Sequence, residues 1–169
     1  MTFAEFEQLG DPPGGKYELH HGELITVAPP KHKHFRIQRS LTRLLEAAGR
    51  NLGVAAAEMP FRPKPEHECW YADVGLISAE RWEQTDPEGN IQGVPELVVE
   101  VLSRSNTAAE ILDKRLTCLE NGAREFWLVN PARSTVEVST PDGHSITYNA
   151  GGQIPLFFGG SMVVDDIFR

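Results

Sequence analysis

Apolar residues near the start of the chain follow first a helical period and then a strand period. Thr2 and Glu5 have the spacing of a capping box and precede apolar residues three apart, which predicts a short N-terminal helix. Two strand-like runs, 17–20 and 23–27, flank His21-Gly22 and predict a β-hairpin, because glycine supplies the positive φ that a tight turn needs.

A longer helical stripe follows two consecutive prolines at positions 29 and 30. Its apolar residues recur at intervals of three and four: Ile37, Leu41, Leu44, Leu45, Ala48 and Leu52. The stripe predicts an amphipathic helix over about residues 31–51. The opposite face carries the basic residues Lys31, Lys33, Arg36, Arg39, Arg43 and Arg50. Both a solvated surface and a phosphate-contacting surface fit that face.

The middle of the chain predicts strands separated by a second amphipathic helix. The expected strands cover 54–58, 70–77, 96–102 and 125–129, with a helical turn at 80–82. The helix begins after Asn106 or Thr107 and ends at Asn121-Gly122. Its inner face is expected to hold Ala108, Leu112, Leu116 and Leu119. A strand, a helix and a strand in this order form a right-handed parallel crossover.

The fold class that follows is α/β, with a mixed central sheet flanked by helices. A second hairpin is expected from strands 135–140 and 146–149, and a short element at 164–168 closes the chain. A length of 169 residues suits one domain, 1–169, with a single sizeable core.

Composition narrows the class of protein. The longest apolar runs are far shorter than the roughly 18 residues of a membrane span, and the N-terminus lacks the pattern of a signal peptide, so we expect a cytoplasmic protein without a membrane partner. The 2 cysteines lie far apart and predict no disulfide framework. A net charge of −8 excludes a general DNA-coating protein, so contact with nucleic acid requires a local basic patch, metal ions or an oligomer.

Two carboxylates interrupt apolar strands. Glu100 lies inside the strand 97–102, and Asp73 directly precedes the apolar run 74–77. A buried carboxylate is costly unless a positive group lies beside it, and two neighbouring carboxylates repel each other. A divalent cation would hold both in the ionised state, and oxygen ligands favour Mg²⁺ or Mn²⁺. The pair is therefore a candidate metal site for phosphodiester hydrolysis.

Lys114 is the candidate cation beside this pair. On a helical wheel it lies next to Ile111 and Cys118, at the flank of the expected inner face, from which its ammonium could reach the strand ends. There it could orient a water or offset negative charge. A surface pair with Glu110, four residues earlier, is the alternative.

Several segments together resemble a known family, the bacterial Uma (Uma-two) endonucleases of the PD-(D/E)XK superfamily. The resemblance covers nearly the whole chain and rests on Tyr17-Glu18-Leu19 with Gly22-Glu23-Leu24, Pro29-Pro30 with His34, Ala72-Asp73-Val74, Pro95 to Ser103, Lys114 with Gly122, and Glu125 to Pro131. It implies a restriction endonuclease-like core and a Mg²⁺- or Mn²⁺-dependent endonuclease that cuts DNA. A homodimer is expected, because two copies can cut both strands of a duplex.

The resemblance also implies roles for individual residues. Asp73 and Glu100 would be metal ligands, the backbone carbonyl of Val101 a third ligand, and Lys114 the catalytic lysine. The superfamily's usual place for that lysine, two residues after the second acid, is Leu102 here; in known branches the lysine has moved to the following helix. Glu23 and His34 match family positions near the site and would support the metal or the water.

Other functions have less support in the sequence. The histidines at 20, 21, 32 and 34 lack the spacing of a helical metal pair, and no Gly-x-Ser-x-Gly turn or glycine-rich phosphate loop is present. A nuclease-fold protein that acts as a binding or interaction module remains the main alternative, and the acidic charge favours it. The choice between DNA and RNA is left open by the residues themselves.

Overall fold

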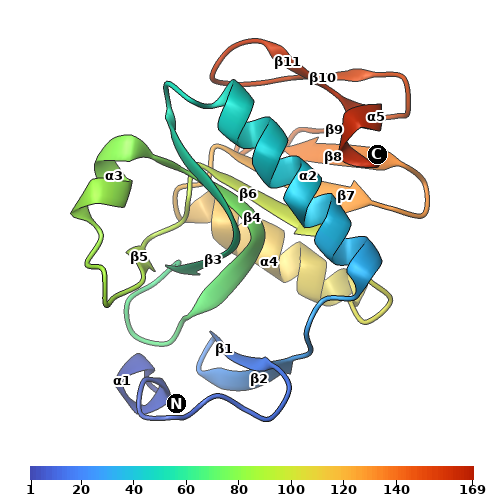
Figure 1. The fold of residues 1–169 in the computed structure, drawn as a ribbon. Helices are drawn as coiled ribbons and strands as arrows, with labels where there is room; N and C mark the ends of the chain where they lie inside the picture. Colours follow the sequence, from blue (N-terminus) through green and yellow to red (C-terminus); the bar gives the residue numbers. More distant parts are fainter.

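A mixed seven-stranded sheet forms the centre of the computed structural model, which describes residues 1–169 (Figure 1). The strand order is β5-β3-β4-β6-β7-β8-β9. The strands are β3 (Gly53–Arg62), β4 (Trp70–Ser78), β5 (Ile91–Gln92), β6 (Leu97–Val101), β7 (Glu125–Asn130), β8 (Thr135–Ser139) and β9 (Ser145–Tyr148). β6 and β7 are parallel, as the predicted crossover requires, and β4 runs antiparallel to β6.

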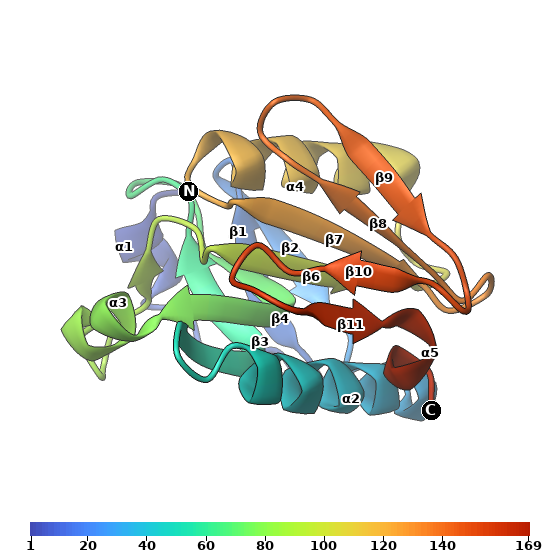
Figure 2. The ribbon, with the colours of Figure 1, turned by 90° about the horizontal axis from the view of Figure 1, so that it is seen from above.

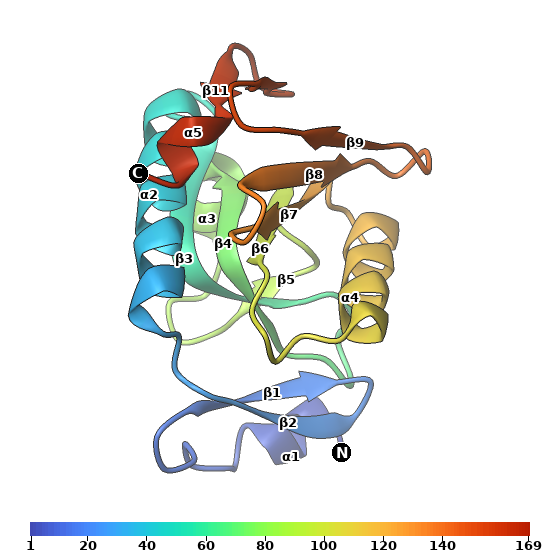
Figure 3. The same ribbon diagram turned by 90° about the vertical axis from the view of Figure 1, so that its right-hand side faces the viewer.

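Helices cover both faces of this sheet. α2 (His32–Ala48) lies on one face and α4 (Ala108–Glu120), which connects β6 to β7, lies on the other (Figure 3). The predicted stripe of α2 buries Ile37, Leu41 and Leu45 in a core that includes Trp127, while the basic face is exposed. On the α4 side, Cys118 packs in a second core with large aromatic residues of the sheet. The remaining helices are the short α1 (Phe3–Phe6), α3 (Ala79–Gln84) and α5 (Val164–Ile167).

Two small antiparallel sheets lie outside the central one. The N-terminal hairpin pairs β1 (Lys16–His20) with β2 (Glu23–Val27), and its turn has the predicted positive φ at His21 and Gly22. Near the C-terminus, β10 (Gln153–Pro155) pairs with β11 (Ser161–Val163). Figure 2 shows this second pair and α5 beside the end of α2.

The predicted α/β class, with a mixed sheet flanked by helices and hairpins at both ends, is confirmed. Element limits differ in places: β3 continues past residue 58 to Arg62, and α2 ends at Ala48 instead of residue 51. The short strands β5, β10 and β11 had no prediction. No helix of the protein has the length and apolar character needed to cross a membrane.

The predicted inner face of α4 is wrong. Leu112 and Leu116 are 45% and 48% exposed, whereas Ile111 and Cys118 are buried. Consecutive residues of a helix point about 100° apart, so the helix is turned by about that angle from the expected orientation. The physical reason is Lys114, which shares the face of Ile111 and Cys118 and is turned towards the sheet, where a carboxylate pairs with it.

Gly53 is required where β3 begins beside the end of β4. A Cβ at this position would lie 1.8 Å from the carbonyl oxygen of Ile77, a backbone atom that cannot move without breaking the strand pairing. We expect Gly53→Ala to lower the free energy of unfolding by about 3 kcal/mol, measured by urea denaturation. Gly10→Ala is the control, since its Cβ meets nothing within 4 Å. Equal midpoints for the two variants would contradict this close approach.

Candidate active site

The two predicted carboxylates lie side by side on neighbouring strands. β4 and β6 are paired so that Val74 is opposite Val99, which brings Asp73 next to the end of β6. The backbone N–H of Val101 donates to Asp73 Oδ2 at 2.7 Å, and the N–H of Asp73 approaches Glu100 Oε1 at 3.3 Å. The strand pairing thus holds both carboxylates at one point of the sheet.

Lys114 reaches the same point from α4. Its Nζ lies 2.8 Å from Glu100 Oε1 and donates to the backbone carbonyl of Tyr71 at 2.7 Å. The side chain is only 11% exposed. The alternative surface pair does not form, because the Glu110 carboxylate accepts hydrogen bonds from Thr107 in a capping box at the start of α4.

Lys114 is held as an ammonium ion. Burial by itself lowers the pKa of Lys114, but the charges of Glu100, Glu18 and Asp73 outweigh burial and raise that pKa above its ordinary value. A lysine with a raised pKa keeps its proton at neutral pH. Lys114 therefore acts here as a positive hydrogen-bond donor and not as a base.

Two residues of α2 hold the other side of Asp73. His34 Nε2 lies 3.0 Å from Asp73 Oδ1, and Gln38, one helical turn later, donates to the same oxygen at 3.2 Å. Burial raises the pKa of Asp73, but the hydrogen bond and charge of His34 outweigh it, so the net pKa is lowered. Burial lowers the pKa of His34, but the hydrogen bond to Asp73 and the charge of Asp73 outweigh burial, so the net pKa of His34 is raised.

Gln38 was not identified from the sequence, although a signal was present. It stands between Ile37 and Leu41 in the apolar stripe of α2, four residues after His34. Residues four apart lie on one helical face, so a polar side chain at that position had to find a partner in the interior. Its Nε2 also donates to Glu58, and its buried Oε1 has no hydrogen-bond partner.

Glu18 is a third carboxylate near Lys114, also missed by the sequence. It is buried on β1, and its Oε2 lies 2.6 Å from His20 Nε2. Burial raises the pKa of Glu18, but the charges of Lys114 and His20 outweigh it and lower the pKa overall. Nothing in β1 distinguishes Glu18, because a short hairpin strand gives no apolar run for a carboxylate to interrupt.

The hairpin that carries Glu18 is fastened to the site. Leu19 and Cys69 exchange two backbone hydrogen bonds of 2.9 Å, which join β1 to the chain just before β4. His21 contacts Glu68 at 2.9 Å and Asp113 of α4 at 2.8 Å. The hydrogen bond to Asp113 is the largest cause of a raised pKa at His21. The hairpin is therefore tied to the residue next to Lys114.

The remaining residues near the site differ in their placement. Glu58 lies on β3, at the position across from Asp73 of β4, and pairs with Lys16. Its φ is +52°, a strained conformation for glutamate. Glu23 is exposed on β2, and no hydrogen bond or ion pair joins it to the other site residues. The structure therefore gathers the predicted Asp73, Glu100, Lys114 and His34, but not Glu23.

The donor set fits a hard divalent cation. Burial raises the pKa of Glu100 to about 8, so the site lacks the positive charge needed to keep all its carboxylates ionised at neutral pH. The partnerless oxygen of Gln38 at the same cluster is an amide oxygen, a ligand type that Mg²⁺ and Ca²⁺ accept. No three acidic, imidazole or thiol groups stand at ligand positions around one point, and Asp73 and Glu100 are hydrogen-bonded to the protein itself.

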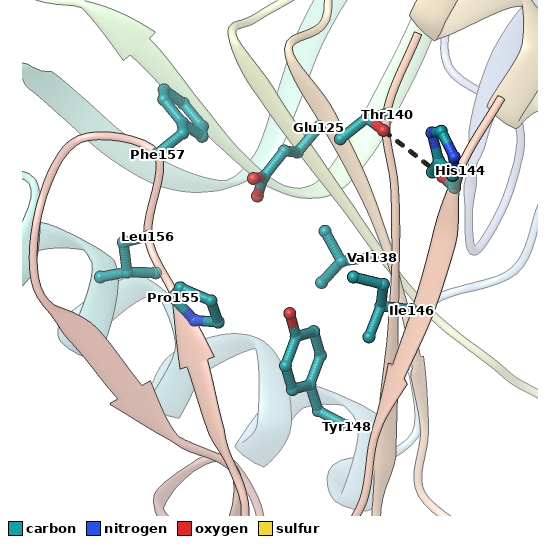
Figure 4. Close-up of a pocket in the computed structure, with 9 residues that line it drawn as sticks. All are labelled: Glu125, Val138, Thr140, His144, Ile146, Tyr148, Pro155, Leu156 and Phe157. Atoms are coloured by element: carbon teal, nitrogen blue, oxygen red, sulfur yellow. Dashed lines mark hydrogen bonds between the residues drawn. The ribbon is translucent and has the colours of Figure 1, made fainter. Parts of the chain in front are cut away.

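A cavity of about 240 Å³ lies elsewhere in the molecule. The carboxylate of Glu125 and the hydroxyl of Tyr148 point into it (Figure 4). Glu125 lies opposite Leu97 at the beginning of β7 and β6, whereas Val101 lies at the end of β6. Leu97 and Val101 are four residues apart, which is roughly 13 Å along a strand. The cavity is therefore separate from the carboxylate site, and none of the predicted residues lines it.

Glu100 should make the stability of the metal-free protein depend on pH. The folded protein keeps a proton on this carboxyl up to about pH 8, whereas the unfolded chain releases it near the ordinary pKa of 4.5. The stabilising contribution is complete below pH 4.5 and is lost as pH rises to about 8. We expect the free energy of unfolding to fall over this range, and Glu100→Gln to flatten the fall, in urea denaturation with EDTA.

The control for this prediction is Glu120→Gln, which removes an exposed glutamate from α4 and leaves Glu100 in place. It should keep the pH dependence of the wild type. If the free energy of unfolding rose between about pH 5 and pH 8 by the same amount in the wild type and in both variants, the proton on Glu100 would be contradicted.

Comparison with solved structures supports the fold. A crystal structure described as a "putative nuclease belonging to DUF820" from Anabaena variabilis superimposes with a TM-score of 0.84 at 21% sequence identity. The match covers 99% of this chain and 97% of that one. At this identity the similarity shows a shared fold. A search of curated proteins gave no match.

Comparison with protein families gives a match over most of the chain. The family profile is Uma2, described as "Putative restriction endonuclease", and it matches residues 3–156. These residues include both carboxylates, Lys114 and the whole central sheet. The chain belongs to the Uma2 family.

Proposed function

We propose that this protein is a Mg²⁺- or Mn²⁺-dependent endonuclease that hydrolyses phosphodiester bonds in DNA. The observation that carries the proposal is the buried contact of Lys114 with Glu100, 2.8 Å long, directly beside Asp73. Two adjacent carboxylates and an ammonium ion are the groups that metal-assisted phosphodiester hydrolysis needs. Membership of a family described as "Putative restriction endonuclease" supports the same reaction.

Asp73 and Glu100 would hold the metal, with the backbone carbonyl of Val101 as a third ligand. A bound divalent cation would supply a water of lowered pKa and offset the negative charge of the phosphodiester. Asp73 is suited to this role because His34 and Gln38 fix its orientation from α2 while Val101 N–H fixes it from β6. An aligned ligand costs little conformational entropy when the metal binds.

Lys114 would orient the attacking water and stabilise negative charge on the phosphate. The Tyr71 carbonyl and Glu100 use two of its three N–H groups, which leaves one donor for water or a phosphate oxygen. A donor fixed before the reaction needs no rearrangement as charge develops in the transition state. The raised pKa of Lys114 keeps this donor charged.

The substrate and assembly follow from the same reaction. We propose double-stranded DNA as the substrate and a homodimer as the active form, because two copies of one site cut both strands most simply. The family description, a restriction endonuclease, supports DNA over RNA.

A binding module that lacks catalysis is the second candidate. It is favoured by a net charge of −8 and by the protein's own hydrogen bonds to Asp73 and Glu100. Calorimetric titration with Mn²⁺ separates the two candidates. The endonuclease binds Mn²⁺ at millimolar concentration or below, and Asp73→Asn weakens that binding; the module binds no Mn²⁺ in either form.

Loss of any of the three central groups should abolish cleavage. We expect Asp73→Asn, Glu100→Gln and Lys114→Gln each to slow nicking of plasmid DNA in Mg²⁺ or Mn²⁺ by on the order of 100-fold or more. Removal of the metal with EDTA should do the same to the wild type. Gel electrophoresis of the plasmid measures the rate.

Lys64→Gln removes an exposed lysine and is the matched control for Lys114→Gln. It should cleave at the wild-type rate, and thermal unfolding should show that all variants are folded. Equal nicking by the wild type, Asp73→Asn and Lys114→Gln would sink the assignment.

Glu18 and Glu23 provide a further test of which hairpin carboxylate supports the site. Glu18 is buried near Lys114, whereas Glu23 is exposed and has no partner there. We expect Glu18→Gln to lower the cleavage rate by roughly tenfold or more, and Glu23→Gln to lower it less. Single-turnover cleavage measures both rates. A larger loss for Glu23→Gln would show that the hairpin moves when substrate binds.

A further inference from the structure

A cavity of about 440 Å³ lies along the first two turns of α2. Its lining includes three cationic side chains, Lys33, Arg36 and Arg169, together with His32, and no acidic side chain. Arg169 pairs with Asp166 at 2.8 Å, whereas Lys33 and Arg36 form no ion pair. In a chain of net charge −8, such a lining is a local excess of positive charge.

The cavity and the carboxylates lie at the same edge of the sheet. β6 and β7 are parallel and adjacent, and the N–H of Leu102 donates to the carbonyl of Val129 where both strands end. The cavity is lined by Pro131 and Ser134, which lie in the turn between β7 and β8. Glu100 stands at the corresponding end of β6. Ligands of open α/β sheets bind outside the carboxyl ends of the strands.

α2 connects the two places directly. His34 and Gln38 contact Asp73 from this helix, while Lys33 and Arg36 line the cavity from another face of it. At about 100° per residue, Lys33 and Arg36 point roughly 100° and 160° away from His34 around the helix, but along the helix axis each lies within roughly 3 Å of it. A group bound in the cavity would therefore lie around the helix from the carboxylate site, within the same turn.

The lining suits a phosphodiester. Lysine and arginine donate charged hydrogen bonds to phosphate oxygens, and arginine can do so with two parallel bonds. Ile37 and Phe168 add apolar walls that fit the sugar beside a phosphate. Phosphate contacts fix the register of a protein on DNA without reading its sequence.

We propose that this cavity binds a backbone phosphate of the DNA strand whose neighbouring phosphodiester enters the carboxylate site. The inference rests on the proposed endonuclease function and adds the group that positions the substrate. An acidic protein needs such a contact, because its overall charge repels DNA. The cavity would supply most of its electrostatic affinity from Lys33 and Arg36.

The test compares two double variants that lose the same charge. Lys33→Gln with Arg36→Gln removes two cations from the cavity. The control, Arg43→Gln with Arg50→Gln, removes two exposed cations outside the cavity, one further along α2 and one just after its end. Both are made in the full chain carrying Asp73→Asn, which leaves the DNA uncut. Fluorescence anisotropy of a labelled duplex in Mg²⁺ measures affinity between about 50 and 200 mM salt.

We expect the cavity variant to bind at least tenfold more weakly and to have a slope of log affinity against log salt that is less steep by roughly 0.9, since one phosphate contact contributes about 0.9. The control variant should keep the parent's slope. Equal slopes for the two variants, or no binding of DNA by the parent, would overturn the proposal. So would tight binding of inorganic phosphate in the cavity without any change in the DNA slopes.

The endonuclease function itself is tested separately, by nicking of plasmid DNA with the wild type. If cleavage depends on Asp73 but the two double variants have equal salt slopes, only the proposed role of the cavity is overturned. If the wild type does not nick DNA but the slopes differ, the endonuclease function is overturned, and with it the role of the bound phosphate in positioning a scissile bond.

Discussion

The structure depends on a buried contact between Lys114 and Glu100. Removing an ammonium ion from water costs several kcal/mol, and its neighbours offset that cost only when geometry and further hydrogen bonds are good. Here the further bonds come from the Tyr71 carbonyl to Lys114 and from the Asp73 N–H to Glu100. Both belong to β4, so the pair fixes α4 against β4 as well as β6. It also turns α4 so that Leu112 and Leu116 face outward.

Five elements meet at this pair, and each supplies a group to the site. β4 and β6 give the carboxylates, α4 the ammonium, α2 the donors to Asp73, and β1 the carboxylate of Glu18. His21 joins the hairpin to Asp113, the residue before Lys114, so that the hairpin and α4 are positioned together. Burial, and to a lesser extent the charges of Asp73 and Glu18, raise the pKa of Glu100 although Lys114 lies beside it. A divalent cation is the natural complement of these carboxylates.

The sequence predicts parts of this arrangement unequally. Asp73 and Glu100 could be predicted because each is a carboxylate in or at the start of an apolar strand, but the predicted crossover joins β6 to β7 and does not place β4 beside β6. The orientation of α4 could not be predicted, since leucines at 112 and 116 form a better apolar stripe than a face containing lysine, whereas in the fold Lys114 faces Glu100 and both leucines are exposed. The placement of Glu18 near the site depends on its tertiary position, and that of Glu58 also on its backbone φ of +52°. The local sequence carries no signal for either.

The distribution of charge would allow an acidic chain to act on DNA, as we propose. Most of the negative charge lies away from α2, whose exposed face is basic, and the two cations nearest to His34 line a cavity at the edge where β6 and β7 end. Few phosphate contacts give weak non-specific affinity at physiological salt, so repulsion from the rest of the surface would keep the protein from coating DNA. A phosphate held beside the carboxylates would then localise the substrate where charge is favourable. Affinity and catalysis would depend on the same helix, through Lys33 and Arg36 on one face and His34 and Gln38 on the next.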